Sequence, residues 1–428
     1  MNRVILSCTL LSANFLFAPH ILAREIKLDL PATLGKAQKE YGPLLAFGNT
    51  ENTVQGIVQK ATRLPNPELA FSWEDFLSTE TSGFQHRKYN FELQMPLELG
   101  GKRSAREESA LAEADLVTLE SEKQKADLFV EIAKAFLDLK EKDALVKLAQ
   151  ERSKLASKLA DIATQKLKAG KLSGVEQGRL SSLAALADIE LGEREINAKN
   201  ASKRVATYIG SSSSTVVDFF FPFEVIPEVS TVPIEDWTQT FAARIARAKS
   251  KKSLSEVSLA GREAIPDLML KVGTIYDRST KENSFSVGFS LPLPLFDRNQ
   301  GGRLLAQALN ETELAREKSI EPETLRELSE VSNSLEFSRA KALQLKNEIL
   351  PKLRESAALL AEAYEKGRVT YLELVETQES LFSIEEKYVE TLSQFHRSVF
   401  SLVFASQVNM GLAKIADLYS FEAKNEVN

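Results

Sequence analysis

The chain has 428 residues and a net charge of −6. This acidic balance, without any basic tract, argues against a nucleic acid as the partner. The only cysteine, Cys8, lies in the N-terminal segment, so the rest of the chain can form neither disulfide bonds nor thiolate metal sites.

Residues 1–23 are predicted to be a secretory signal peptide. Arg3 supplies a short positive region, an apolar run follows from Val4 to Leu22, and Ala23 offers a small residue for cleavage. A lipid-modified Cys8 is the alternative, although this cysteine comes too early to follow an apolar core of normal length. Because no later stretch approaches about 18 consecutive apolar residues, we expect either a periplasmic protein or an outer-membrane β-barrel.

A first structural unit is expected over residues 24–210. It contains the stretch from Lys102 to Ala169, which has neither Gly nor Pro and is rich in good helix formers. At about 1.5 Å per residue, one helix of this length would span roughly 100 Å, which no compact domain needs. The predicted elements, in order, are a helical segment (31–62) with breaks at Gly42-Pro43 and Gly48-Asn49, a β-hairpin (68–98), the long helix (102–169) and a return helix (172–209).

Within this hairpin, apolar and polar residues alternate with the period of a β-strand. The apolar face comprises Tyr89, Phe91, Leu93, Met95 and Leu97, and the polar face includes Asn90, Glu92 and Gln94. Such a strand is expected to separate an apolar environment from a wet one.

The same order of elements is predicted again after a linker. The linker, residues 211–235, contains three prolines and a candidate short strand. The second unit, residues 236–410, comprises a helix up to 262, a hairpin (267–295), a long helical region (300–366) broken at Pro322 and Pro351, and a return helix (370–409), and residues 411–428 form a tail. In the return helix an apolar residue recurs every seven positions, the spacing of a supercoiled seam, at Leu374, Leu381, Tyr388, Phe395 and Leu402.

The two units are related by duplication. Pro96 precedes Pro292 by 196 residues, and Gly170 precedes Gly367 by 197. This period is too long for a solenoid. We therefore expect a tandem internal repeat of one unit, built of a helix, two strands, a long helix and a return helix.

The hairpins indicate a membrane. Each strand has about 9–12 residues, the length that a tilted strand needs to cross a bilayer. Four strands cannot close a barrel and open edges are not tolerated in lipid, so several chains would have to pool their strands, and three chains would give twelve. The lumen of that barrel would be lined by Asn90, Glu92, Gln94, Lys271, Ser286 and Ser290. The alternative is a soluble α+β protein with an amphipathic hairpin, for which the chain supplies no other core.

Motifs spread over the chain resemble the TolC-type outer-membrane efflux channels, most closely their heavy-metal (CzcC-like) branch. They are Pro65-Asn66-Pro67-Glu68-Leu69, Leu97-Glu98-Leu99-Gly100-Gly101-Lys102-Arg103, Leu291-Pro292-Leu293-Pro294-Leu295-Phe296-Asp297-Arg298-Asn299-Gln300-Gly301, Ile349-Leu350-Pro351, and Tyr371-Leu372-Glu373-Leu374 with Gln378. Each motif alone is weak, but together they cover nearly the whole chain after the signal segment and are specific as a set.

The resemblance implies an α+β protein of the outer membrane of a Gram-negative cell. It implies a homotrimer in which four strands per chain complete a twelve-stranded β-barrel, continued into the periplasm by a long α-helical barrel. It also implies a periplasmic adaptor (a membrane-fusion protein) and an inner-membrane pump, often of the resistance-nodulation-division type, as partners. The implied function is passive export, with heavy-metal cations as the cargo of this branch. Export of drugs, type I protein secretion, and a role as a periplasmic coiled-coil adaptor are the alternatives.

Two sites follow from the resemblance. The turns at the far ends of the long helices match the tips that contact the adaptor, here Lys168, Gly170, Lys171, Ser173, Gly367, Arg368, Thr370 and Tyr371. The alternative is that these residues only cap helices. Glu373 and Glu376 share one helix face and match an acidic ring at the tunnel entrance, which would attract cations, whereas in isolation they would be ordinary surface charges.

The sequence shows no catalytic constellation, so we expect no enzyme, no cofactor and no metal site. His86 and His396 lie far apart in the sequence and are interpreted as bystanders. A metal-export outlet needs no tight site, because a ligand that held the ion would slow its release.

Overall fold

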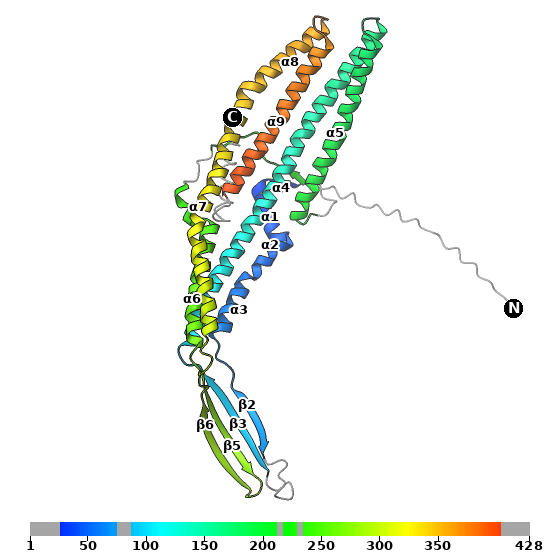
Figure 1. Cartoon of the computed structure of the whole chain (residues 1–428). Coiled ribbons are helices and arrows are strands. Elements are labelled where there is room, and N and C mark those ends of the chain that lie inside the picture. The colour runs from blue at the N-terminus through cyan, green and yellow to red at the C-terminus, as the bar shows by residue number, and fades with distance from the viewer. Residues whose placement is uncertain (1–25, 75–86, 212–216, 229–233, 404–428) are drawn as a thin grey trace, which may run out of the picture.

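The computed structural model describes residues 26–74, 87–211, 217–228 and 234–403. The predicted signal peptide, the tail from 411, Cys8 and His86 lie outside this part of the chain. The molecule is elongated, with a β-sheet at one end and long helices that extend from it to two helical turns at the other end (Figure 1).

The first unit begins with a broken helical segment and ends with a helical hairpin. Asp29 caps the first helix, since its side chain accepts a hydrogen bond of 2.8 Å from the Ala32 amide. The elements are β1 (Ile26–Leu28), α1 (Leu30–Glu40), α2 (Gly42–Ala46), α3 (Thr50–Thr62), β2 (Glu68–Glu74), β3 (Lys88–Leu97), α4 (Lys102–Lys168) and α5 (Gly174–Tyr208). A 3₁₀ turn at Phe47–Asn49 separates α2 from α3. The 67-residue α4 is one continuous helix, as its composition predicts.

The second unit repeats this order with an interrupted long helix. Its elements are β4 (Val217–Phe219), a 3₁₀ turn (Ile234–Gln239), α6 (Phe241–Glu263), β5 (Leu268–Asp277), β6 (Glu282–Ser290), α7 (Gln300–Gln344), a π-helical turn (Leu345–Ile349), α8 (Leu350–Glu365) and α9 (Tyr371–Val403). The hairpin of α8 and α9 lies beside the hairpin of α4 and α5 (Figure 1).

One predicted break in the second long helix is wrong and the other is confirmed. Pro322 lies inside α7, which continues through it. Proline removes one backbone hydrogen bond and the turns on both sides retain theirs, so the helix persists. Pro351 follows the π-helical turn at the first positions of α8, where its missing N–H costs nothing.

The predicted end of the second hairpin is also wrong. Strand β6 ends at Ser290, whereas the alternating pattern predicts a strand up to Leu295. Pro292 and Pro294 explain the difference, because neither has an N–H to donate to a neighbouring strand. Nine residues, 291–299, therefore lie between β6 and α7 without helical or strand structure.

All four long strands form one antiparallel sheet with the order β2-β3-β5-β6. The pairing of β3 with β5 joins the two units and runs from Lys88 opposite Asp277 to Leu97 opposite Leu268. Strands β2 and β6 are the two edges of the sheet. The short strands β1 and β4 form a separate parallel pair.

The main hydrophobic core lies in the middle of the helical part, where α4, α9, α1 and the segment after β4 meet. Phe136 on α4 is fully buried, and the rings of Phe219 and Phe221 contact it edge-on at centroid distances of 5.7 and 6.0 Å. The predicted seam of α9 faces this core and two smaller buried clusters nearer the tip: Leu374, Leu381, Phe395 and Leu402 are buried, and Tyr388 packs against the clusters that contain the last three.

The sheet is joined to the helices at the start of α4. Gly100 and Gly101 both have φ of +70°, a conformation that favours glycine, and a Cβ at Gly100 would lie 2.3 Å from Ile265 Cδ1. Lys102 Nζ lies 2.7 Å from Asp267 Oδ1, which ties the start of α4 to the residue before β5.

Candidate functional sites: the helical tip and the sheet

The two turns at the far end of the helices have the same backbone structure. In the first, the Gly170 amide donates to Leu167 O at 2.9 Å and the Lys171 amide donates to Lys166 O at 2.8 Å. In the second, the Gly367 amide donates to Tyr364 O at 3.0 Å and the Arg368 amide donates to Ala363 O at 2.9 Å. Both are Schellman motifs, with φ of +69° at Gly170 and +70° at Gly367.

The helices that leave these turns also start alike. Ser173 and Glu176 form a capping box, in which the Ser173 amide donates to Glu176 Oε2 at 3.1 Å and the Glu176 amide donates to Ser173 Oγ at 3.2 Å. Thr370 and Glu373 repeat this arrangement with distances of 3.1 and 3.4 Å. The hydrogen bonds from Ser173 lower the pKa of Glu176, because they stabilise its charged form.

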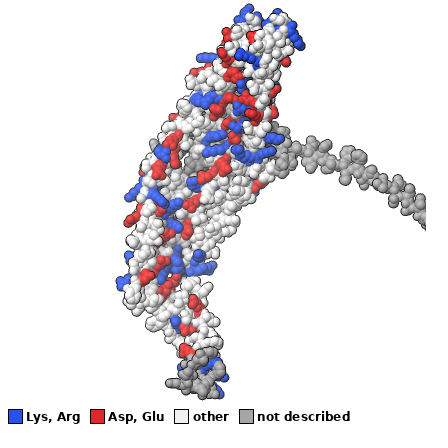
Figure 2. All heavy atoms as spheres, turned by 45° about the vertical axis from the view of Figure 1, so that its right-hand side comes forward, with Lys and Arg blue, Asp and Glu red and all other residues white. Residues whose placement is uncertain are grey.

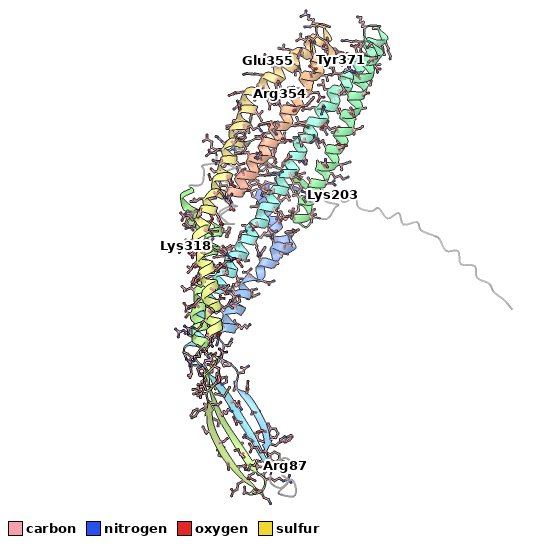
Figure 3. All side chains as sticks on the ribbon, viewed as in Figure 1. Arg87, Lys203, Lys318, Arg354, Glu355 and Tyr371 are labelled. Atoms are coloured by element: carbon pink, nitrogen blue, oxygen red, sulfur yellow. The ribbon has the colours of Figure 1, made fainter. Side chains whose placement is uncertain are left out.

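Of the predicted adaptor-contacting residues, all except Tyr371 are exposed at these turns. The exposed residues are Lys168, Gly170, Lys171, Ser173, Gly367, Arg368 and Thr370. Tyr371 is half-buried, and its hydroxyl accepts a hydrogen bond of 3.0 Å from Arg179 Nη1 on α5. Figure 3 shows Tyr371 at the helical tip and Arg87 at the opposite end of the molecule, beside the sheet.

The predicted acidic pair lies just behind the second turn. Glu373 and Glu376 are both on the first turns of α9, and both are exposed. Glu373 has a second role, because its carboxylate accepts the Thr370 amide as part of the capping box. A substitution that tests the charge of Glu373 must therefore preserve this capping contact.

An ion-pair network joins the two helical hairpins, and sequence reasoning missed it. Arg152 on α4 contacts Glu190 on α5 at 2.7 Å and Glu379 on α9 at 2.6 Å. Arg194 on α5 contacts Glu386 on α9 at 2.8 Å. No sequence signal identifies these pairs, because Arg152 and Glu379 are separated by 227 residues.

The apolar packing beside this network continues to the tip. A buried cluster joins both hairpins, with Leu159, Leu180, Tyr364 and Leu374 as its largest members. Lys166 Nζ lies 4.0 Å from the centroid of the Tyr364 ring, a cation–π contact between the hairpins. The two tip turns are thus held together by apolar, cation–π and hydrogen-bond contacts.

The register of the sheet places all six predicted lumen residues on one face. Opposite residues in antiparallel strands share a face, and Glu92 opposes Gly273, which opposes Ser286, whereas Gln94 opposes Lys271. Asn90 and Ser290 follow at even spacing along β3 and β6. Lys271 Nζ lies 3.7 Å from Glu92 Oε1, so this polar face carries an ion pair.

The other face of the sheet is apolar and uncovered. On the edge strand β6, Phe285, Val287 and Phe289 are 89%, 78% and 77% exposed. On the other edge, Leu69 is 76% exposed. Figure 2 shows charged residues of both signs extending along the helices.

His396 on α9 is fully buried against the segment that follows β4. Its Nε2 lies 2.9 Å from Phe223 O, and its ring contacts Phe221 and Phe395. Burial lowers its pKa to about 4, because the charged form would lose hydration, so the ring is neutral. Within the ranges that the structure covers, no group of three or more His, Cys, Asp and Glu side chains could hold a metal ion. Among the described helices, none is both long and apolar enough to cross a membrane.

Comparison with known proteins identifies the class. A family model described as "Outer membrane efflux protein" matches residues 58–211 and 239–406, one segment in each unit. The chain therefore belongs to the outer membrane efflux protein family and is a protein of the outer membrane. The expected resemblance to TolC-type channels and the tandem repeat are confirmed.

Individual relatives sharpen this assignment. The chain is 27% identical over 383 residues to the cobalt-zinc-cadmium resistance protein CzcC of Cupriavidus metallidurans, covering 88% of this chain and 89% of CzcC. It is 22% identical over 246 residues to the nickel-cobalt-cadmium resistance protein NccC of Alcaligenes xylosoxydans xylosoxydans, covering 55% and 54%. The crystal structure of the outer membrane protein VceC from Vibrio cholerae has the same fold, with a TM-score of 0.72 at 17% identity over 90% of this chain and 95% of VceC.

Proposed function

We propose that three copies of the chain form a passive outer-membrane outlet for heavy-metal cations. In this proposal a periplasmic adaptor and an inner-membrane pump, of the resistance-nodulation-division type, deliver the cargo to the helical tip. Membership of the outer membrane efflux family and similarity to CzcC and NccC, which are named for metal resistance, support it. No step of this function requires catalysis by the chain.

The uncovered apolar face of the sheet is the observation that carries the proposal. Four strands with free edges at β2 and β6 cannot be stable in lipid, because the unpaired backbone groups of the edges would lack partners. Three copies would pair each β6 with the β2 of a neighbour and close twelve strands. The apolar face would then contact lipid and the face with Glu92 and Lys271 would line the lumen.

Assembly can be tested directly. We expect the full chain to be extracted from membranes only with detergent, as a trimer that dissociates on heating. Recovery of a folded monomer from the periplasm without detergent would overturn the proposal.

The helical tips are proposed as the adaptor contact. The two turns share one backbone motif and lie at the end farthest from the sheet, with Lys168, Lys171 and Arg368 exposed around them. A pair of turns with the same backbone structure from each copy would offer an adaptor a similar surface twice per chain. Cross-linking from the positions of Lys171 and Arg368 to a co-purified adaptor would test this contact.

Glu373 and Glu376 are proposed to form an acidic ring at the entrance. Three copies would place six carboxylates around one aperture, where their summed field would concentrate cations. Replacing both residues by glutamine removes the charge. A glutamine in place of Glu373 would still be able to cap the helix, because glutamine serves at this position of a capping box.

The ring is tested by single-channel recording of the Glu373→Gln/Glu376→Gln variant. We expect selectivity for cations over anions to fall by on the order of tenfold. Glu355→Gln is the matched control, since Glu355 is an exposed glutamate on α8, away from the start of α9 (Figure 3). Unchanged selectivity would overturn the proposed acidic ring and would leave the proposed trimer standing.

The cargo is tested in cells. Loss of the gene should lower tolerance to Zn²⁺, Co²⁺ and Cd²⁺, and the wild-type gene should restore it. Loss of drug tolerance, with unchanged metal tolerance, would show a drug outlet of the same architecture instead.

A further inference from the structure

The segment between β6 and α7, residues 291–299, displays large apolar side chains in an exposed position. Leu293, Leu295 and Phe296 are 71%, 66% and 92% exposed. The segment lies at the helical end of the sheet, where the chain turns from the strands into α7 (Figure 1). We call it the junction loop.

The junction loop has a defined backbone. The Leu295 amide donates to Leu293 O at 2.8 Å, and the Asn299 amide donates to Asp297 Oδ1 at 2.8 Å. Asn299 Nδ2 also donates to Ala260 O on α6 at 2.9 Å, which anchors the end of the loop to the helices. Holding apolar side chains in water by an ordered backbone is unfavourable, so a surface that covers them is expected.

The connection itself does not require this loop. In the first unit only four residues, 98–101, join β3 to α4, and the turn is closed by Gly100 against Ile265. The second unit uses nine residues for the same connection and places Phe296 where the first has Gly100, at the offset of 196. The extra apolar surface is therefore a property of the second unit, separate from the need to connect a strand to a helix.

The depth of the loop follows from the length of β6. Its nine residues, at about 3.4 Å each and tilted by roughly 40°, rise about 23 Å, close to the roughly 25 Å apolar band of an outer-membrane barrel. The strand thus fills the hydrocarbon layer, and the loop that follows lies at its boundary on the side of the helices. Leu291, Leu293 and Leu295 continue the spacing of the exposed apolar residues of β6 to this boundary.

Positive charges flank the apolar part of the loop. Arg298 is exposed beside it and its Nε donates a hydrogen bond of 3.1 Å to Pro294 O, and Arg303 is exposed on the first turn of α7. Among the described residues, neither arginine forms an ion pair with a carboxylate. Phe296 and two arginines in this order combine an aromatic residue with cations, the composition that suits a membrane interface with anionic phosphates.

We propose that the junction loop is a membrane-interface anchor, in which Phe296 and the leucines enter the phospholipid leaflet on the periplasmic side and Arg298 and Arg303 contact lipid phosphates. The inference rests on the proposed outer-membrane trimer, because that arrangement defines which side of the sheet faces lipid. The anchor would fix the height of the helical tunnel relative to the membrane at three points per trimer.

The test uses the full-length trimer in vesicles of phosphatidylethanolamine and phosphatidylglycerol that carry brominated acyl chains, which quench tryptophan. The chain has two tryptophans, Trp73 and Trp237. In a Trp73→Phe/Trp237→Phe background, Phe296→Trp reports on the loop. Phe337→Trp is the matched control, since Phe337 is 69% exposed on α7 and far along the helix from the loop. A variant that keeps only Trp73, on the apolar face of β2, reports on insertion of the sheet.

We expect bromine near the headgroups to quench the Phe296→Trp variant roughly twofold more than bromine near the chain ends, as for an interfacial aromatic residue. The Phe337→Trp control should not be quenched. In the loop reporter, Arg298→Gln/Arg303→Gln should weaken the shallow quenching in vesicles with phosphatidylglycerol, whereas Arg326→Gln, a change of an exposed α7 arginine that is paired with Glu330, should not.

The remaining outcomes distinguish a failure of the anchor from a failure of the proposed channel. Quenching of Trp73 without quenching of the loop reporter overturns the anchor and leaves the channel proposal standing. If a cross-link from position 296 then joins two copies, a neighbouring copy covers the loop instead of lipid. Absence of quenching at both sites shows that the sheet is not in the membrane, and the proposed function fails with the anchor.

Discussion

The two units of the chain have the same order of elements and differ in the continuity of their long helices. Their tip turns share the same pair of backbone hydrogen bonds, and both return helices start with a capping box. The long helices have almost the same total length, 67 residues in α4 against 45, 5 and 16 in α7, the π-helical turn and α8. The second is interrupted, whereas the first is continuous.

The difference follows from the environment of each helix. α4 passes through the centre of the core and buries large side chains such as Phe129, Ile132 and Phe136. α7 buries mainly small residues and exposes Leu304, Leu305 and Phe337. Local turn chemistry is thus preserved in both units, because it depends only on neighbouring residues, while the long helices diverge because their packing partners differ.

The largest effect is expected from the core of the first unit. Phe136→Ala should lower the free energy of unfolding by about 3–5 kcal/mol, since it leaves a cavity among buried aromatic rings. Phe337→Ala on α7 should change it by less than about 0.5 kcal/mol, because that ring is exposed. Thermal unfolding of the detergent-extracted protein compares the two. Equal losses would show that the outer face of α7 is as buried in the working protein as that of α4.

A second difference between the units concerns the dependence of their stability on pH. His396 is buried and neutral, whereas the residue 197 positions earlier is the exposed Lys199. The folded pKa of His396, about 4, is below its ordinary value of 6.5, so the unfolded chain binds more protons between these values. Stability should therefore fall as the pH is lowered from 6.5 to 4, by about 3 kcal/mol from this group.

Denaturant unfolding at about pH 7 and about pH 4.5, on either side of most of this titration, checks the prediction. His396→Gln should lose the contribution of the histidine to the pH dependence, and Lys199→Gln should retain it. The same pH dependence in His396→Gln and in the wild type would contradict the burial of a neutral ring.

The tip turns should respond equally in the two units. Gly170→Ala and Gly367→Ala should each cost about 1 kcal/mol, because alanine is disfavoured at positive φ and nothing else crowds either site. Gly178→Ala, inside α5 with open space around it, should instead stabilise the protein by about 0.5–1 kcal/mol. A cost at only one of the two turns, measured by thermal unfolding, would show that the repeat is not preserved there.

The smallest effect is expected at the capping boxes. The pKa of Glu176 is lowered from its ordinary value of 4.5, so its stabilisation of the helix start is present above that pH and is lost as the pH falls through the lowered pKa. Hydrogen exchange at residues 173–177 should accelerate in this range relative to the intrinsic rate, and Glu176→Ala should remove the change. If Glu373→Ala accelerates hydrogen exchange at residues 370–374 as much as Glu176→Ala accelerates it at residues 173–177, the two caps are equivalent. A response that is confined to one of the two units would show that the two capping boxes are not equivalent.

The sequence alone determined the repeat, the long helices, the tip turns and the two faces of the strands. These features depend on local chemistry: helix formers without Gly or Pro, glycine at positive φ, and alternation with period two. The seam of α9 was predictable for the same reason, because its spacing marks the face that packs.

Only the tertiary structure decided where these elements end and what joins them. The alternation up to Leu295 indicates a strand, but Pro292 and Pro294 have no N–H for a ladder, so β6 ends at Ser290. The pairing of β3 with β5 and the contacts of Arg152 with Glu190 and Glu379 join segments far apart in the chain. No local pattern encodes such contacts, because they arise when two complete units pack side by side.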